Sequence, residues 1–161
     1  YVQEECGLNS KCVPVGMSCG GLMGIKFTAR HPELVQCLYL DAPVVNYMSC
    51  PCGFGIGNPL AADNSEILNA LGLKDISQLL AYRDMPLDKL GDLIKAQIPV
   101  VMVAGDSDQV VPYCENGIFL EKAYKDAGVE IEVYIKPGCD HHPLGLADPK
   151  APLEFILRHC K

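Results

Sequence analysis

Four short apolar runs separate longer segments whose apolar residues recur at helical spacing. The runs lie near 12–16, 35–41, 98–104 and 130–136; the first three are almost continuously apolar, and the last has apolar residues at 131 and 133–135. Apolar runs of this length are typical of strands that are buried on both faces. Such strands, when they alternate with helices, form parallel sheets covered by helices on both sides. The pattern therefore predicts an α/β fold with one parallel sheet of four strands.

The helical patterns lie between and after these runs. They cover six segments: 20–30, 64–71, 75–83, 86–96, 114–127 and 150–160. Asn64 and Asp75 are expected to cap the N-termini of the two short helices, because their side chains can accept from free backbone N–H groups. Residues 44–60 are rich in Gly and Pro, which is typical of a loop. We therefore expect residues 44–96 to form a small helical cap inserted into the fold.

Length, composition and charge describe an ordinary globular domain. With 161 residues, 49% hydrophobic and 20% charged, the chain fits a single domain that spans residues 1–161. The net charge is −7 and no basic run occurs, so we expect no nucleic-acid partner. No apolar run approaches the roughly 18 residues that a membrane span needs, so we expect no membrane partner.

The nine cysteines indicate reduced thiols. Nine is an odd number, so complete pairing within the chain is impossible. Cys12, Cys19 and Cys37 lie in or beside apolar segments, where a free thiol behaves as a small hydrophobic group. We therefore expect a cytoplasmic protein. Cys50 and Cys52 are closer together than the cysteines of a zinc-binding CxxC pair, and we expect neither a metal nor a cofactor.

One motif carries a candidate nucleophile. Residues 16–20 read Gly-Met-Ser-Cys-Gly, a G-x-S-x-G motif between a predicted strand and a predicted helix. In this context a sharp turn strains the backbone of Ser18 and exposes its hydroxyl, and glycine on both sides leaves room for close approach. The N–H of Cys19 then points to where an oxyanion would develop. The alternative interpretation is a glycine-rich turn without chemistry.

Three aspartates compete for the role of a carboxylate that orients a histidine. Asp106 and Asp108 follow the most apolar predicted strand, and Asp41 ends the strand before it. An aspartate at the carboxyl end of a strand can hold an imidazole in one tautomer and stabilise its charge. Aspartates at such positions also form turns and helix caps. The pattern alone leaves the choice open.

The candidate bases are His141 and His142, in the loop after the last predicted strand. The other two histidines, His31 and His159, end helices and are expected at the surface. The candidates follow the chain order Ser, Asp, His, which is the order of α/β-hydrolases. A parallel sheet brings the carboxyl ends of its strands to one edge, where ligands bind. We therefore expect one histidine to reach Ser18.

From residue 11 to its C-terminus the chain resembles the serine α/β-hydrolase superfamily. Four segments carry the resemblance: 15–21, 38–43, 103–112 and 137–146. The resemblance implies that Ser18 is the nucleophile. It implies that the acid is Asp108, the aspartate of the G-x-x-D-x-x-V-P stretch. It also implies that the base is His141, three residues after the glycine of the Pro-Gly turn.

The activity that the resemblance implies is acyl transfer without a cofactor. The N–H of Cys19 and a donor outside this sequence would bind the oxyanion. The doubled histidine followed by Pro143, with Asp148-Pro149 downstream, resembles a subgroup of bacterial hydrolases that act on carbohydrate esters. We expect a small-molecule or carbohydrate ester as substrate. A peptidase is the alternative, because an acyl-enzyme mechanism serves both.

The sequence departs from the family in one respect. Roughly four strands normally precede the nucleophile strand in this fold, and this sequence lacks them. We expect the chain to be a fragment or to need a partner chain that supplies them. We also expect the strand at 12–16 to lie at an open edge of the sheet, with exposed apolar side chains. A non-catalytic binding module is the alternative from another functional class.

Overall fold

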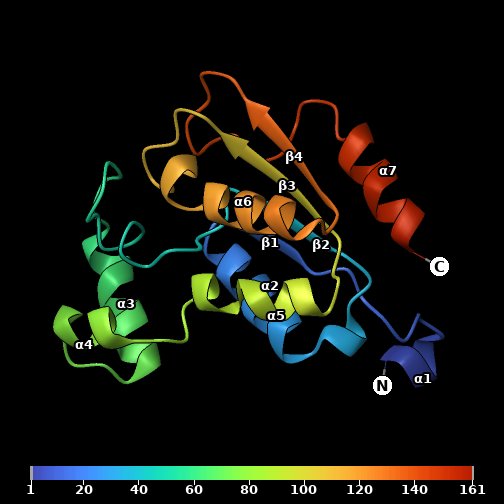
Figure 1. Cartoon of the computed structure of the whole chain (residues 1–161), viewed down its shortest axis with the longest axis horizontal. Coiled ribbons are helices and arrows are strands. Elements are labelled where there is room, and N and C mark those ends of the chain that lie inside the picture. The colour runs from blue at the N-terminus through green and yellow to red at the C-terminus, as the bar shows by residue number, and fades with distance from the viewer. Residues whose placement is uncertain (1, 161) are drawn as a thin grey trace.

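The computed structural model describes residues 2–160 and contains one sheet of four strands. The strands are β1 (Val15–Met17), β2 (Leu38–Asp41), β3 (Val100–Gly105) and β4 (Ile131–Lys136). They lie side by side in the order β1-β2-β3-β4, and every neighbouring pair is parallel (Figure 1). The predicted α/β fold with a four-stranded parallel sheet is confirmed.

The helices follow the predicted segments closely. They are α1 (Val2–Cys6), α2 (Cys19–Arg30), α3 (Ala61–Leu71), α4 (Ile76–Ala81), α5 (Leu90–Lys95), α6 (Gly117–Ala127) and α7 (Lys150–His159), with 3₁₀ turns at Pro32–Leu34, Pro86–Lys89 and Tyr113–Glu115. Asp75 caps α4 as predicted, because its Oδ1 accepts from Gln78 N at 3.1 Å. The prediction for Asn64 is wrong. Helix α3 already begins at Ala61, so Asn64 lies inside its first turns.

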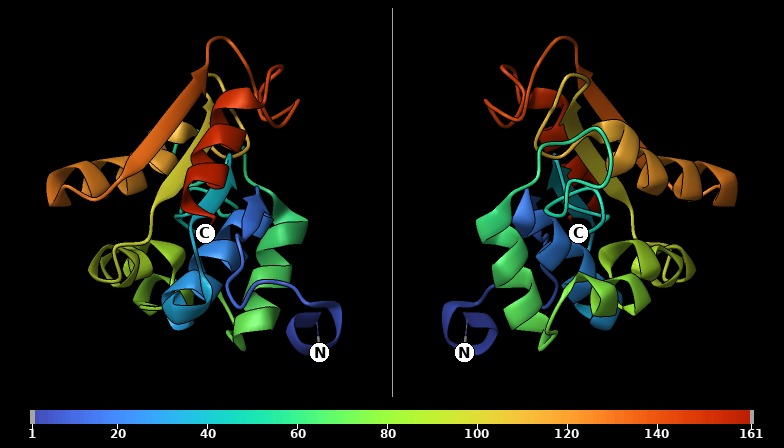
Figure 2. Two further views of the ribbon diagram at one scale, coloured as in Figure 1. Left: turned by 90° about the vertical axis from the view of Figure 1, so that its right-hand side faces the viewer. Right: turned by 90° about the vertical axis from the view of Figure 1, so that its left-hand side faces the viewer.

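Helices cover both faces of the sheet. On one face α2, α5 and α6 pack over the strands through fully buried side chains: Ile25, Leu38, Leu40, Leu93, Met102 and Leu120. On the other face Phe155 of α7 packs against Cys37 and Val101. Figure 2 shows α6 and α7 on opposite sides of the strands. Because β3 is central and covered on both faces, all six of its residues are buried, as a continuous apolar run predicts.

The predicted cap, residues 44–96, divides into two parts. The loop after β2 and the helices α3 and α4 build a separate apolar cluster around Tyr47, Leu79 and Met85. This part lies beside the sheet, at the left of Figure 1. Helix α5 instead packs into the main core through Leu90 and Leu93. The idea that the first part acts as a cap over a pocket stays a prediction.

Strand β1 lies at an edge of the sheet. It starts at Val15, later than predicted, and Cys12 contributes only an isolated bridge to Val35. The side chains of Val15 and Met17 are 62% and 48% exposed, whereas Gly16 is buried beneath α2. The predicted apolar edge is therefore confirmed. The expectation that this run is buried on both faces is wrong, because within residues 2–160 a helix covers only one face of β1.

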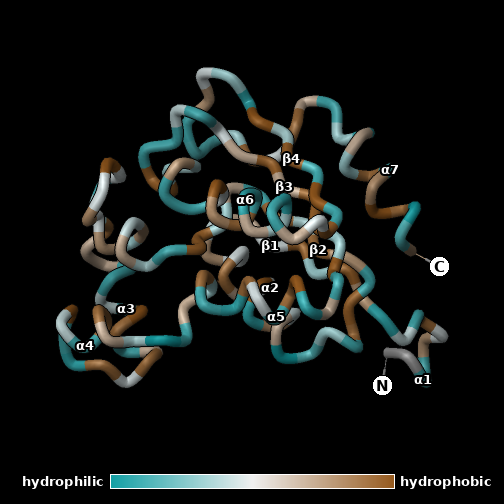
Figure 3. The backbone as a smooth tube through the Cα atoms, viewed as in Figure 1, coloured by the Kyte–Doolittle hydropathy of each residue, from teal (hydrophilic) through white to brown (hydrophobic). Residues whose placement is uncertain are grey.

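Apolar residues gather along the strands and on the inner sides of the helices, as Figure 3 shows. Of the helices that the structure describes, none is long and apolar enough to cross a membrane.

The nine cysteines are all free thiols. Burial raises the pKa of Cys37 to about 11 and that of Cys50 to about 12, so these thiols are neutral core groups.

An ion-pair cluster joins α2 to the segment between α4 and α5. Asp84 Oδ2 lies 2.7 Å from Lys26 Nζ, and its Oδ1 lies 2.6 Å from Lys89 Nζ. Tyr82 OH donates to the same carboxylate at 3.2 Å. The hydrogen bond from Lys26, which has the larger effect, and the hydrogen bond from Lys89 hold the pKa of Asp84 well below its usual range. The cluster therefore ties the segment that follows α4 to the body of the domain.

We predict that Asp84→Asn lowers the melting temperature at pH 7 by a few degrees. The effect is modest because the Asp84 side chain is 36% exposed and solvent screens its ion pairs. A depressed pKa in the folded state stabilises the fold above the unfolded value of about 3.9, and this contribution is lost as the pH falls further. Thermal melts from pH 7 to pH 3 should show the difference from wild type shrinking below about pH 4.

Asp126→Asn is the matched control for this prediction. Asp126 makes only an exposed pair with Lys122 on α6, so its variant should melt like the wild type throughout. A difference between Asp84→Asn and wild type that stays constant down to pH 3 would contradict the electrostatic explanation.

Candidate active site

Ser18 occupies the sharp turn between β1 and α2. Its backbone has φ 52° and ψ −121°, a strained conformation for a residue with a side chain. The turn is held from both ends. Ser18 N donates to Asp41 O at 2.9 Å, and Ser18 O accepts from Gly21 N at 2.8 Å and from Val44 N at 3.1 Å. These bonds fix the backbone so that the hydroxyl projects from the edge of the sheet, as the motif predicts.

The glycines of the motif are not equivalent. A Cβ at Gly16 would lie 2.6 Å from Gly20 O and 2.8 Å from Gly21 Cα, so the start of α2 packs directly on Gly16. A Cβ at Gly21 would lie 2.5 Å from Pro43 Cβ. A Cβ at Gly20 would meet nothing within 4 Å. Close approach of α2 therefore requires glycine at position 16, as expected, but not at position 20. It also requires glycine at position 21, for which the motif predicts no role.

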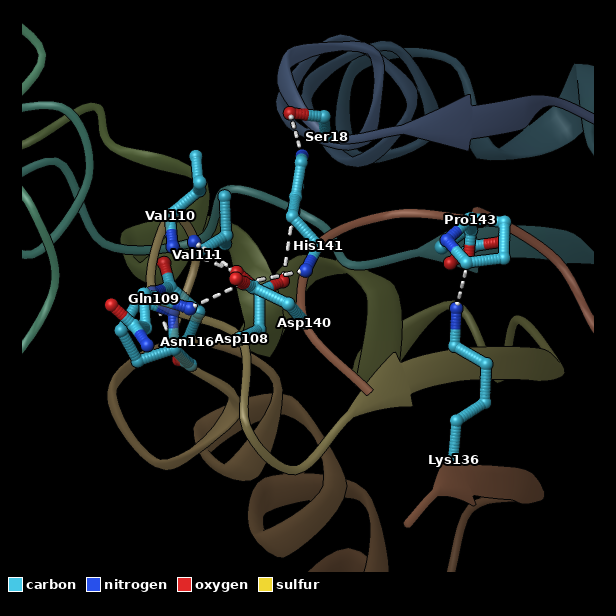
Figure 4. A network of polar contacts seen from close by, with 12 residues as sticks. Ser18, Asp108, Gln109, Val110, Val111, Asn116, Lys136, Asp140, His141 and Pro143 are labelled. Atoms are coloured by element: carbon cyan, nitrogen blue, oxygen red, sulfur yellow. Dashed lines mark hydrogen bonds and ion pairs between the residues drawn. The ribbon is translucent and has the colours of Figure 1, made fainter. Parts of the chain in front are cut away.

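The structure brings Ser18, His141 and Asp108 together (Figure 4). His141 Nε2 lies 3.0 Å from Ser18 Oγ, and His141 Nδ1 lies 2.8 Å from Asp108 Oδ2. The side chains of His141 and Asp108 are 8% and 1% exposed, so water competes little for the bond between them. If Nδ1–H donates to Asp108, Nε2 is left to accept the Ser18 proton. The catalytic role of the three residues stays a prediction.

Backbone donors hold the acid in place. Asp108 Oδ1 accepts from Val110 N at 2.8 Å and from Val111 N at 2.7 Å. This leaves Oδ2 for the imidazole. Two successive N–H groups, those of Val110 and Val111, thus fold back onto the carboxylate and fix its orientation.

The competing candidates have other contacts. Asp106 Oδ1 accepts from Gly138 N at 2.7 Å and from Ser107 Oγ at 3.0 Å, so it ties the Pro-Gly turn to the end of β3. Asp41 is fully buried, and its carboxylate accepts from Tyr39 and Gly145. His142 is exposed and stacks edge-on against His141, with ring centroids 5.0 Å apart. The structure therefore brings His141 and Asp108, and not their neighbours, to Ser18.

Two further residues position this site, and the sequence pattern does not single them out. Asp140 Oδ1 accepts from Gln109 N at 2.9 Å and from His141 N at 2.7 Å, which joins the acid loop to the base loop. The same two bonds lower the pKa of Asp140, so its carboxylate is ionised at neutral pH. The only signal for this role in the sequence is its place directly before His141.

Asn116 is the second of these residues. It is 1% exposed, and its Oδ1 accepts from Val45 N and Asn46 N, both at 3.0 Å. Its Nδ2 donates to Pro112 O at 3.2 Å. Asn116 therefore anchors the loop after β2 to the segment that follows the acid. The sequence pattern predicts a helix at 114–127 that includes position 116, whereas α6 begins only at Gly117.

Cys19 is the first residue of α2, where a backbone N–H has no partner within the helix. This N–H follows the strained Ser18 directly, as the predicted oxyanion donor must. Its contact with an oxyanion stays a prediction. Partial burial of the thiol, and then the charge of Asp63, raise the pKa of Cys19, so this thiol is neutral at pH 7.

The parallel sheet and the strained serine between strand and helix define part of an α/β-hydrolase fold. The prolyl oligopeptidase family matches residues 1–159, so the chain belongs to this family of serine hydrolases. No curated protein matches the chain significantly.

Three solved structures illustrate the likeness in fold. Puromycin hydrolase matches with TM-score 0.70 and 16% identity, over 96% of this chain and 22% of that one. Acylaminoacyl peptidase from Pyrococcus horikoshii matches with TM-score 0.67 and 14% identity, over 88% and 22%. Monoacylglycerol lipase from Paleococcus ferrophilus matches with TM-score 0.55 and 16% identity, over 98% and 72%. The chain thus spans about a fifth of the two longer enzymes.

We predict that Gly16→Ala and Gly20→Ala differ sharply, although both lie in the same motif. The added methyl at 16 would collide with backbone atoms of α2, which costs about 1–3 kcal/mol of unfolding free energy and displaces Ser18. The methyl at 20 meets no atom. Urea unfolding and labelling of Ser18 by a fluorophosphonate should show losses for Gly16→Ala only. Equal behaviour of the two variants would contradict this account of the turn.

Proposed function

We propose that the chain hydrolyses an ester of a small molecule or a carbohydrate through an acyl intermediate on Ser18. One observation carries the proposal. Two hydrogen bonds connect Ser18 to Asp108 through His141. Ser18 Oγ lies 3.0 Å from His141 Nε2, and His141 Nδ1 lies 2.8 Å from Asp108 Oδ2. A hydroxyl, an imidazole and a buried carboxylate in this order form the triad that activates a serine nucleophile.

In the first half of the reaction Ser18 Oγ attacks the ester carbonyl carbon while His141 Nε2 takes its proton. The carbonyl oxygen becomes an oxyanion, to which Cys19 N–H donates. His141 then passes the proton to the departing alkoxide, and the bond from carbon to the alcohol oxygen breaks. Asp108 remains a carboxylate throughout and stabilises the imidazolium that forms between these two transfers.

In the second half water releases the acid. His141 takes a proton from water as the water oxygen attacks the acyl carbon, which gives a second tetrahedral intermediate. When this collapses, the bond to Ser18 Oγ breaks and His141 returns the proton to the serine. The products are an alcohol and a carboxylic acid, and the chain is regenerated.

An ester suits this site better than an amide. In this proposal Cys19 N–H is an oxyanion donor, and each such donor is typically worth about 10²–10³-fold in kcat. An alkoxide leaves a tetrahedral intermediate more readily than an amine does, so ester cleavage tolerates weaker oxyanion stabilisation. The lipase among the matched structures, 72% of whose length this chain covers, is consistent with ester chemistry.

Amide hydrolysis is the second candidate. It is supported by membership of the prolyl oligopeptidase family and by the likeness to acylaminoacyl peptidase. The same three residues would serve, with an amine in place of the alkoxide as leaving group. The two candidates differ in the substrate that is cleaved faster.

We predict slow, Ser18-dependent hydrolysis of p-nitrophenyl acetate and still slower hydrolysis of an N-acylated amino-acid p-nitroanilide. Release of p-nitrophenol and p-nitroaniline is followed by absorbance for the wild type, for Ser18→Ala and for Ser65→Ala, an exposed serine on α3. Ser18→Ala should fall to the buffer rate, and Ser65→Ala should match the wild type. Faster cleavage of the anilide would favour the peptidase. A wild type no faster than Ser18→Ala would favour a non-catalytic binding module.

We also predict that Asp108→Asn is far more damaging than Asp106→Asn. The amide at 108 favours the wrong imidazole tautomer, a change that costs about 10⁴-fold in kcat in a serine protease triad. The amide at 106 keeps an oxygen that can still accept from Gly138 N. Steady-state kinetics of the two variants on the same ester measure the difference. Equal losses would show that Asp108 has no special role.

A further inference from the structure

Besides the contacts of His141 itself and a backbone bond from Ser107 N to Cys139 O at 3.1 Å, four hydrogen bonds of side chains fasten the loop that carries His141. The fastening bonds run between Asp106 and Gly138 N, between Asp140 and Gln109 N, between Lys136 Nζ and Pro143 O, and between Asp41 and Gly145 N. The first three involve exposed groups, whereas the Asp41 side of the fourth is fully buried. This last contact lies four residues after the base and needs a separate explanation.

The buried carboxylate of Asp41 lowers the stability of the folded chain. Its Oδ2 accepts from Gly145 N and from Tyr39 OH, the latter at 3.3 Å. Its Oδ1 is buried, and the described residues give it no hydrogen-bond partner. An unsatisfied buried polar atom costs about 1–3 kcal/mol. Burial raises the pKa of Asp41 despite the nearby charge of Lys136, and burial also raises the pKa of Tyr39 to about 12.

The same residue also holds the nucleophile. The backbone oxygen of Asp41 accepts from Ser18 N at 2.9 Å, across the pairing of β1 with β2. Asp41 therefore contacts the turn that carries Ser18 through its main chain and the loop that carries His141 through its side chain. Each of these segments depends on the same rigid strand end for its position.

We propose that Asp41 is a positioning residue that sets the distance between Ser18 and His141. Its carbonyl fixes the serine turn, and its carboxylate fixes the base loop at Gly145. A fixed reference of this kind matters because misplacement by about 1 Å can cost about 100-fold in rate. The kinetic part of this inference rests on the proposed hydrolase function, and its structural part does not.

The test compares Asp41→Asn with Asp41→Ala. Asparagine keeps an oxygen that can accept from Gly145 N, and alanine removes it. Hydrogen exchange of a peptide covering residues 142–148 reports the loop, and kcat and KM on p-nitrophenyl acetate report the site. Asp41→Ala should exchange faster and lose about 10- to 100-fold in kcat with little change in KM. Asp41→Asn should remain close to wild type in both, and Asp126→Asn on the surface of α6 should match it.

A second variant keeps the test valid if Asp41→Ala does not fold. Gly145 has φ 78°, and a Cβ there meets nothing within 4 Å, so Gly145→Ala strains the loop without disturbing the core. It should accelerate exchange over 142–148 and lower kcat while far-UV circular dichroism shows that the chain stays folded. If Asp41→Ala folds and keeps wild-type exchange, or if it does not fold and Gly145→Ala keeps wild-type exchange, the proposal is overturned.

Two further outcomes are informative. A folded Asp41→Asn that is as impaired as Asp41→Ala would show that the charge matters and not the hydrogen bond to Gly145, which overturns the positioning role. A wild type without Ser18-dependent turnover would reject the hydrolase function but not this inference. The exchange of residues 142–148 then decides alone, because faster exchange in Asp41→Ala than in Asp41→Asn still supports it.

Discussion

Parallel strand pairing brings the chemistry of this chain to one edge of the sheet. Ser18 and His141 are 123 residues apart in sequence, yet Oγ and Nε2 lie 3.0 Å from each other. They meet because β1 and β4 run in the same direction as the strands between them, so that all carboxyl ends coincide. The core serves this alignment. Strand β3, which is buried on both faces, holds the sheet in place, so the loops that follow the strands start from fixed positions at the same end of the sheet.

Carboxylates at this edge have distinct tasks, which their surroundings determine. Asp108 is buried, takes two backbone N–H bonds and faces the imidazole. Asp106 and Asp140 are exposed and use their oxygens to fasten backbone turns. Asp41 is buried with one oxygen unpartnered, which lowers the stability of the fold next to the Ser18 turn. The same side chain thus acts as orienting acid, turn former or internal anchor.

The sequence predicts what depends on local pattern. Continuous apolar runs place the buried strands, and G-x-S-x-G places the strained serine. The choice of Asp108 over Asp106, and of His141 over His142, came from a family resemblance, because adjacent residues in a loop share the same local pattern. Only the folded backbone decides which of them faces the site.

Features that depend on tertiary contacts escaped prediction. The apolar run at 12–16 by itself predicts a strand buried on both faces, and only the comparison with the family's strand order predicts the open edge at which Val15 is exposed. The role of Asn116 depends on a loop about 70 residues earlier in the chain, whose backbone N–H groups donate to its side chain. Likewise, the segment 44–96 divides because the apolar residues of α5 match the main core, whereas those of α3 and α4 match one another. Apolar spacing predicts a helix but not its packing partner.

The central claim is that Ser18 is a nucleophile activated by His141 and Asp108. A crystal structure of the chain after reaction with a fluorophosphonate tests it most directly. The account predicts a covalent bond from phosphorus to Ser18 Oγ. It also predicts a phosphonyl oxygen facing Cys19 N–H and an imidazole of His141 still held by Asp108. Phosphorus bound to another side chain, or an unmodified Ser18 beside an intact His141, would contradict it.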